Sequence, residues 1–361
     1  MDSNADAEWP AALEDSRSAG LGVIAAYRFR AADAKTPPAF RGVAVSTAKL
    51  GEVLDELFAN VTPNEDDRGG EFVWYHLSSR ADHARNWLSS CRHVAADARD
   101  FLLDTHAVPG RVEAIAHDVA GCLSDLAYDF TGDPSEIRSF RFFVTDRILI
   151  TVREEAIATT NRLRLAIRDG RTFGGPRALL NELLGYQADA LRALVDDAED
   201  RLEHIEDRIF GGAQTVEEGA LSRIRWLCGR LQRRFAPEHK VLAQLRRTAD
   251  LHASGIDVEL LVDRMQQFEE TLAAVSDVQS RARLLQEEVN SRQASATSRN
   301  LYFLSIFTAL MLPVTLVTGV FGMNVAGLPG TKSEDAFVWV IIGMLALAVA
   351  SLAGLRLKKL I

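Results

Sequence analysis

The sequence has few cysteines, and its first residues do not have the pattern of a secretory signal. Its 361 residues include only 3 cysteines, Cys91, Cys122 and Cys228, which lie far apart without a C-x-x-C pair. This spacing argues against a disulfide framework and against a zinc knuckle, and it is typical of a reducing compartment. Residues 1–20 are acidic and alanine-rich, without the basic and apolar regions of a secretory signal. We expect a flexible N-terminus over residues 1–20 and a cytosolic location for the residues that follow.

Catalytic motifs are also missing. The sequence contains no H-E-x-x-H, no G-x-S-x-G and no phosphate-binding Walker loop. Among its 8 scattered histidines, His76, His83 and His93 are candidates to converge on a metal, although structural histidines are the commoner case. The sequence therefore predicts a protein that is not an enzyme and has no cofactor.

An excess of positive charge, which nucleic-acid binding usually requires, is absent as well. The chain has 41 Lys+Arg against 50 Asp+Glu and a net charge of −9, so we expect no nucleic-acid partner. With 47% hydrophobic and 25% charged residues, it is not disordered. Its mean hydropathy of −0.02 would also argue against a membrane protein, but an average hides where the apolar residues lie.

The most informative absence is a long stretch without charge. No Asp, Glu, Lys or Arg occurs between Arg299 and Lys332. Within this window, residues 301–321 are almost wholly apolar and long enough to span a hydrocarbon core of about 30 Å. A second uncharged run covers residues 337–355. We predict two transmembrane helices at 301–321 and 337–355.

Flanking charges predict how these helices are oriented. Basic residues precede the first run and follow the second, in a tail at 356–361 (Arg292, Arg299, Arg356, Lys358 and Lys359). The loop at 322–336 carries only one lysine. The positive-inside rule places both termini in the cytoplasm and this loop outside. We expect a multi-pass protein of the cell (inner) membrane, with the lipid bilayer as a partner.

Residues 21–175 mix short strands with helices. Strands are predicted at 22–29, at 72–77 and at 140–152, the last as a hairpin. Helices are predicted at 80–91, 94–103 and 111–118. The expected fold of this region is a cytosolic α+β domain with a mixed sheet.

From residue 176 onwards the pattern is purely helical. Three-four spacing of apolar residues predicts a helical hairpin over 176–256, whose second helix bends at Pro237. The first helix is acidic and the second is basic, so the two either pair or leave a cation-gathering surface. A third helix begins near 257 and meets no stop signal before Phe321. At 1.5 Å per residue this stalk helix, 257–321, is about 98 Å long.

One face of the first apolar run carries small or hydroxyl-bearing residues with two leucines. These residues alternate at three and four positions: Ser298, Leu301, Ser305, Thr308, Leu312, Thr315, Gly319 and Gly322. The stripe is either a helix-packing face or a pore lining in which the two leucines form hydrophobic constrictions. Two helices cannot enclose a pore, so the second interpretation requires a ring of subunits.

A Gly-Met-Asn tripeptide, Gly322-Met323-Asn324, ends this run before a short loop, a last apolar run and a basic tail. In this position it resembles the CorA family of divalent metal-ion transporters. Pro313, Thr318-Gly319 and Lys358-Lys359 stand where that family has them, and the segment from Arg230 to Pro237 resembles its arginine-rich helix. The order of the parts extends the resemblance to most of the chain.

The resemblance implies a homopentameric funnel whose pore is lined by the first membrane helix, with Asn324 around the outer mouth. Mg²⁺ sheds water reluctantly, so a ring of amides would hold the hydrated ion through outer-shell hydrogen bonds. The charge-free window also lacks His and Cys, so zinc would pass largely hydrated too. The expected partners are further copies of the chain and divalent cations: zinc or magnesium, or cobalt or nickel.

Two branches of the family fit different parts of the motif. The loop at 325–330, VAGLPG, resembles that of the ZntB zinc-transporter branch, whereas Met323 stands where that branch often has Val or Ile. The leading prediction is a zinc-type importer of the ZntB kind, with the proton coupling that the branch implies. The alternatives are a CorA-type magnesium, cobalt or nickel channel and, in another class, a membrane-anchored coiled-coil scaffold.

Overall fold

The computed structural model describes residues 22–33, 39–59, 70–127, 136–211, 218–251, 258–323 and 335–357. It divides the chain into two compact units, residues 1–283 and 284–361. The predicted N-terminal segment 1–20, the part from Asn324 to Glu334 of the loop predicted to be external, and the end of the basic tail lie outside the described residues.

The first unit contains an eight-stranded sheet in the order β4-β5-β6-β7-β3-β1-β2-β8. All neighbouring strands are antiparallel except β3 and β7, which are parallel. The sheet is therefore mixed, as the sequence predicted. Its strands are β1 (Val23–Asp33), β2 (Ala39–Ala44), β3 (Phe72–Ser78), β4 (Val112–Ile115), β5 (Asp118–Leu126), β6 (Ile137–Val144), β7 (Ile148–Arg153) and β8 (Thr172–Phe173).

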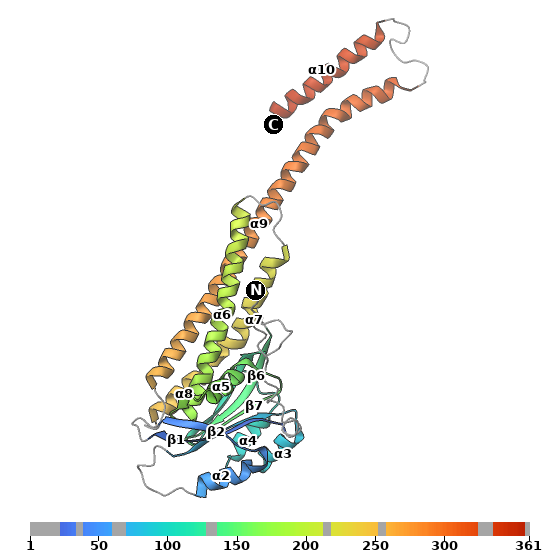
Figure 1. The fold of residues 1–361 in the computed structure, drawn as a ribbon. Helices are drawn as coiled ribbons and strands as arrows, with labels where there is room; N and C mark the ends of the chain where they lie inside the picture. Colours follow the sequence, from blue (N-terminus) through green and yellow to red (C-terminus); the bar gives the residue numbers. More distant parts are fainter. Residues whose placement is uncertain are drawn as a thin grey trace, which may run out of the picture. The chain divides into compact units, whose positions relative to one another are not determined.

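Helices cover both faces of this sheet (Figure 1). On one face, α2 (Leu50–Ala59), α3 (Asp82–Ser90) and α4 (Ala96–Leu103) share a buried apolar cluster with the strands. On the other face lie α5 (Ala158–Arg168) and the long α6 (Pro176–Phe210). Since both faces are covered, the central strand β3 is buried from Phe72 to Leu77.

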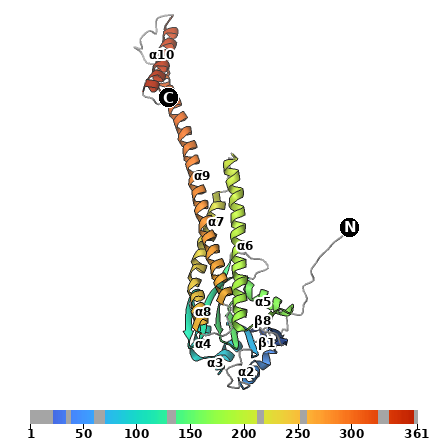
Figure 2. The same ribbon diagram turned by 90° about the vertical axis from the view of Figure 1, so that its left-hand side faces the viewer.

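Three further helices pack on α6. They are α7 (Glu218–Phe235), α8 (His239–Leu251) and the first part of α9 (Val258–Phe321). A short 3₁₀ turn, η2 (Ala236–Glu238), joins α7 to α8 at the expected proline bend. The helix α9 runs parallel to α6, because Gln267 contacts Asp189 and Arg281 contacts Glu206 further along both helices (Figure 2). Its buried residues recur at three-four spacing: Phe268, Thr271, Val275 and Val278.

One predicted helix is wrong. Residues 111–118 form β4 and the first residue of β5, which pair as a hairpin from Val112↔Gly121 to Ile115↔Asp118. The turn between them is Ala116-His117, and Ala116 adopts φ 57°. A turn of this type usually carries Asn or Gly, so its sequence signal was missing. The spacing of Val112 and Ile115, three residues apart, fitted a helix equally well.

The second unit begins at Leu284 and contains the remainder of α9, including its apolar part, and the helix α10 (Ala336–Leu357). These two helices match the expected apolar runs, and α10 runs back antiparallel to the end of α9 (Figures 1 and 2).

Candidate functional site: the exposed stripe of helix α9

The apolar residues of the second unit are exposed instead of forming a core. Two described helices are long and apolar enough to cross a membrane, and the most apolar window of each is 0% buried within the chain. Leu304, Phe307 and Leu316 are each at least 60% exposed. An apolar surface of this extent needs a hydrocarbon surrounding or a protein partner. Because each helix satisfies its backbone hydrogen bonds internally, both are suited to hydrocarbon.

The predicted small-residue stripe lies on the most open side of α9. All eight of its residues, Ser298 to Gly322, are exposed. The residues of intermediate exposure in this part of the helix lie on the opposite side: Ile306, Leu310, Pro313, Val314 and Val317. Steps of three and four average close to the 3.5-residue repeat of a left-handed helical bundle. The stripe is therefore available to face the axis of such a bundle.

Hydroxyl groups on the stripe are anchored to the helix backbone. The hydroxyls of Ser305, Thr308 and Thr315 each donate to the carbonyl oxygen four residues earlier, at 2.8 Å. Each hydroxyl oxygen retains lone pairs as acceptors. These groups can bind water through oxygen without leaving a donor unsatisfied in the membrane.

Pro313 lies inside α9. Proline has no backbone N–H, so the carbonyl of Ala309 lacks its usual helical donor. Within a lipid-facing helix such a carbonyl is costly, but beside water it is an additional polar group. Pro313 itself lies on the side opposite the stripe.

The helix ends at the predicted motif. After Phe321, the Gly322 N–H donates to Thr318 O at 2.9 Å, and the Met323 N–H donates to Val320 O at 3.3 Å. A Cβ added at Gly322 would lie only 2.9 Å from the Thr318 oxygen, so the tight end of the helix favours glycine there. Gly319, by contrast, has nothing within 4 Å. Asn324 lies outside the described residues.

Two of the histidines named as metal candidates, His76 and His93, contact protein groups. His76 is buried beside Thr151, with 2.8 Å between Nδ1 and Oγ1, and burial together with Arg153 holds its pKa well below the ordinary value. His93 pairs with Asp55 at 2.6 Å and stacks on Phe58. Within the described ranges, no three His, Cys, Asp or Glu side chains converge as a metal site.

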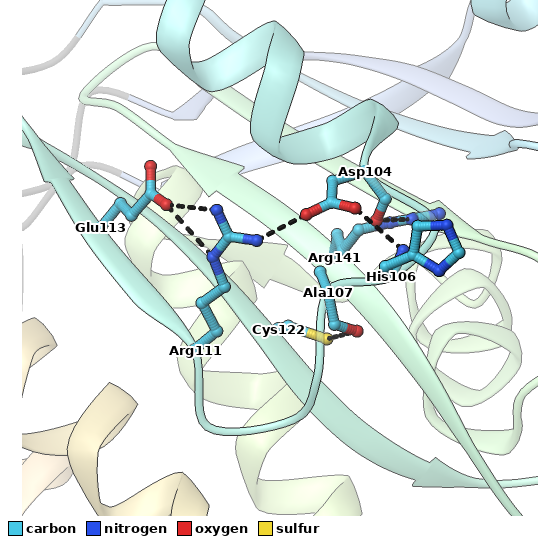
Figure 3. Close-up of polar contacts among 7 residues, drawn as sticks. All are labelled: Asp104, His106, Ala107, Arg111, Glu113, Cys122 and Arg141. Atoms are coloured by element: carbon cyan, nitrogen blue, oxygen red, sulfur yellow. Dashed lines mark hydrogen bonds and ion pairs between the residues drawn. The ribbon is translucent and has the colours of Figure 1, made fainter.

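A polar cluster at the end of α4 is also occupied by protein contacts (Figure 3). Arg111 bridges the carboxylates of Asp104, at 2.5 Å, and Glu113, at 2.8 Å. The N–H of His106, aided by Arg111, lowers the pKa of Asp104. Arg141, which is buried, donates to the Asp104 carbonyl. This cluster fixes the loop at 104–111 by neutralising its own charges.

The acidic helix α6 uses several of its carboxylates locally. Asp196 and Asp197 pair with Arg192 and Arg201 on the same helix, and Glu206 pairs with Arg281 of α9 at 3.0 Å. These pairs are largely exposed and contribute at most about 1 kcal/mol each. The pair of Glu206 with Arg281 shows that α9 also supplies positive charge to α6, which the sequence interpretation had not considered.

The sequence interpretation also missed a set of buried polar residues. Asp125, Gln187 and Glu238 are 0%, 3% and 1% exposed and lie where β5, α6 and η2 meet. Burial raises the pKa of Glu238 to about 8 and that of Asp125 to about 7. An acidic residue directly after Pro237, in an arginine-rich segment, was the signal available for Glu238.

Comparison with known proteins adds to this geometry. A sequence model of the family described as CorA-like Mg²⁺ transporter protein matches residues 69–357. Over 268 residues the chain is 24% identical to the divalent cation transporter CmaX of Pseudomonas aeruginosa, covering 74% of this chain and 81% of that protein. Over 290 residues it is 22% identical to the zinc transport protein ZntB of Yersinia pseudotuberculosis, covering 79% and 86%.

The fold is similar to that of a solved structure as well. Full-length CmaX superposes with a TM-score of 0.75 at 21% identity, over 94% of this chain and 98% of that chain. The similarity therefore extends over both the sheet-containing unit and the apolar helices.

Proposed function

This chain belongs to the family of CorA-like Mg²⁺ transporter proteins, so it is a divalent cation transporter and not an enzyme, and we propose that its pore is lined by the stripe of α9 in a homopentamer. The observation that carries the proposal is the stripe itself. Its residues are small or hydroxyl-bearing, except for two leucines, and all are exposed on one side of an apolar helix. Five such stripes facing one axis would enclose a water-accommodating path.

Chemistry of the lining indicates that the cation passes hydrated. No charged residue, His or Cys occurs from Asn300 to Thr331, so the lining offers hydroxyl and carbonyl oxygens in place of carboxylate, imidazole or thiolate ligands. Mg²⁺ keeps its water readily, and outer-shell contacts with neutral oxygens suit it. Zn²⁺ would forgo its preferred nitrogen and sulfur ligands on the same path. In this proposal Asn324 forms the selective ring at the outer mouth.

The finer proposal is a zinc-type importer of the ZntB kind, driven by protons. It is supported by the loop at 325–330 and by relatives named as zinc transport proteins. The alternative is a magnesium, cobalt or nickel channel, supported by Met323 and by the hydrated character of the path. Both place the protein in the inner membrane with its termini in the cytoplasm, in agreement with the flanking basic residues.

Reconstitution distinguishes these possibilities. The full chain in liposomes would be tested for influx of Mg²⁺, Zn²⁺, Co²⁺ and Ni²⁺, with and without a pH gradient. Zinc influx that rises with an inward proton gradient supports the zinc-type importer. Influx that follows the membrane potential, regardless of pH, supports the channel. Absence of flux for all four ions would contradict the pore and favour a membrane-anchored scaffold.

Replacing Leu312 by serine should raise cation influx severalfold. Leu312 is 63% exposed on the stripe, and an apolar ring at this level would repel water and oppose a hydrated ion. The measurement is initial influx into liposomes at matched protein density. Leu310→Ser is the control, because Leu310 lies on the opposite side of the helix. Equal influx in both variants would remove Leu312 from the lining.

A further inference from the structure

The bend between α7 and α8 packs against strand β5 and against Gly110, which lies just before β4. On one side of the bend, Gly110 approaches so closely that a Cβ there would lie 2.6 Å from the Pro237 oxygen. On the other side, the Glu238 carboxylate accepts a hydrogen bond from the Ser124 N–H. The Ser124 hydroxyl also donates to the carbonyl of Arg234, at 3.0 Å. The bend is thus fastened by backbone contacts on both sides of η2.

Ser124 presents its backbone groups to side chains at the edge of β5. The pairing of β5 with β4 ends at Gly121, so the outer edge of β5 beyond this residue has no β4 partner. At Ser124, Glu238 takes the N–H, and Gln187 Nε2 donates to the carbonyl at 2.6 Å. Gln187 Nε2 also donates to Glu238 Oε2 at 2.7 Å, so both oxygens of the Glu238 side chain accept a hydrogen bond. Two side chains therefore replace a neighbouring strand, as buried backbone groups require.

No cation neutralises Glu238 among the residues that the structure describes. Its side chain meets Ser124 of β5, Gln187 of α6 and its own bend. The titratable groups that interact electrostatically with Glu238 include Asp125 and Cys122 on β5, and His239 follows it in the chain. Asp125 is itself bonded to Thr159 at the start of α5 and faces the positive charge of Arg153. An ionised Glu238 would be a buried negative charge with two hydrogen-bond donors but no counter-charge.

We propose that Glu238 is a reversible proton-binding site that fastens the α7–α8 bend to β5 when it is neutral and loosens the bend when it is ionised. A neutral acid keeps one oxygen for the Ser124 N–H, accepts from Gln187 Nε2 through a lone pair of its hydroxyl oxygen, and needs no counter-charge. An ionised acid gains most by opening towards water, and η2 is the element that would move with it. The ligand of this site is a proton, and the inference holds whichever metal the pore carries.

The direction of the pH dependence follows from burial. Burial, reinforced by the charge of Asp125, raises the pKa of Glu238 from 4.5 to about 8, against the hydrogen bonds from Ser124 and Gln187. Between these two values the folded bend binds more protons than the opened one. Its stability therefore falls as pH rises through this interval and levels off above about 8.

Hydrogen exchange of the full chain in detergent tests the site. Protection factors, corrected for the intrinsic pH dependence of exchange, would be measured for 121–126 and 236–245 from about pH 6 to about pH 9.5. The expected result is a fall of roughly tenfold or more across this range in the native chain, because a shift of one pKa unit corresponds to a tenfold change in the equilibrium. Constant protection factors in the native chain would overturn the proposal, without any variant being needed.

Matched variants test whether Glu238 is the group that binds the proton. E238Q should lose the pH dependence; because its amide N–H group faces the Gln187 donor, its protection should be lower than that of the native chain at about pH 6 but constant across the range. E203Q, which removes one charge from the exposed face of α6, should behave as the native chain does. H239Q should also keep the dependence, because His239 is exposed and bonds to Ala236 O. A dependence that survives E238Q but disappears in D125N would place the proton on Asp125 and overturn the assignment. Cation influx, measured separately, is independent of this outcome.

Discussion

Asn324→Ala should reduce divalent cation influx to the background of empty liposomes while the oligomer still assembles. In the proposed pore, each subunit contributes one amide to a ring that holds the hydrated ion through its water shell. Alanine removes every one of these hydrogen bonds at once, because the ring is built from identical residues. The measurement is influx of the cation found to be transported, beside the elution volume of the variant on size exclusion.

A matched control tests whether removing an asparagine amide elsewhere in α9 has the same effect on influx. Asn290→Ala removes an exposed asparagine whose side-chain oxygen accepts from Gln286 at 3.2 Å, in α9 well before the charge-free window. It should leave both influx and assembly close to those of the native chain. Normal influx through an intact Asn324→Ala oligomer would refute the proposed role of Asn324.

Gly110→Ala should destabilise the sheet-containing unit more than a typical surface substitution. Gly110 adopts φ +84°, and a non-glycine residue in this region costs about 1–2 kcal/mol. The new Cβ would also lie 2.4 Å from the Pro237 Cβ, and overpacking of this kind costs about 1–3 kcal/mol more. Because backbone atoms of Pro237 are among the nearest contacts, no side-chain rotation relieves the clash. Denaturant unfolding of the full chain, followed by the fluorescence of buried Trp74, measures the loss.

Gly170→Ala isolates the first of these two contributions. Gly170 has a similar φ of +88°, but its nearest neighbour is the Arg41 side chain, at 3.6 Å. We expect this variant to lose only the conformational part, about 1–2 kcal/mol. Equal losses in the two variants would show that Pro237 does not press on Gly110. The bend at η2 would then be held by Ser124 and Gln187 without Gly110.

Much of the architecture was predictable because it rests on local patterns. The strands around Phe72 and Phe140 and the long helices α6 and α9 have strong apolar periodicities. Pro237 marks a bend that local sterics impose on any helix. The two apolar helices need only a hydrophobic run of sufficient length, so the sequence indicates them directly.

The parts that were not predictable depend on contacts between distant residues. The β4–β5 hairpin turns at Ala116 and His117, where no Gly or Asn announces a positive φ. The role of Glu238 depends on Ser124, more than a hundred positions earlier in the chain, and on Gln187 from a third element. The stripe of α9 was visible in the sequence. The exposure of its residues, on the side of α9 opposite the partly covered residues, could be seen only in the structure.

The strand order has a consequence for how the protein is made. The sheet is completed when β8, at Thr172-Phe173, pairs with Phe40 and Arg41 of β2. All eight strands have therefore left the ribosome well before residue 301, where the apolar run begins. At about 5–20 residues per second, this interval lasts on the order of ten seconds. The sheet thus has time to form during synthesis, before the insertion machinery receives the first membrane helix.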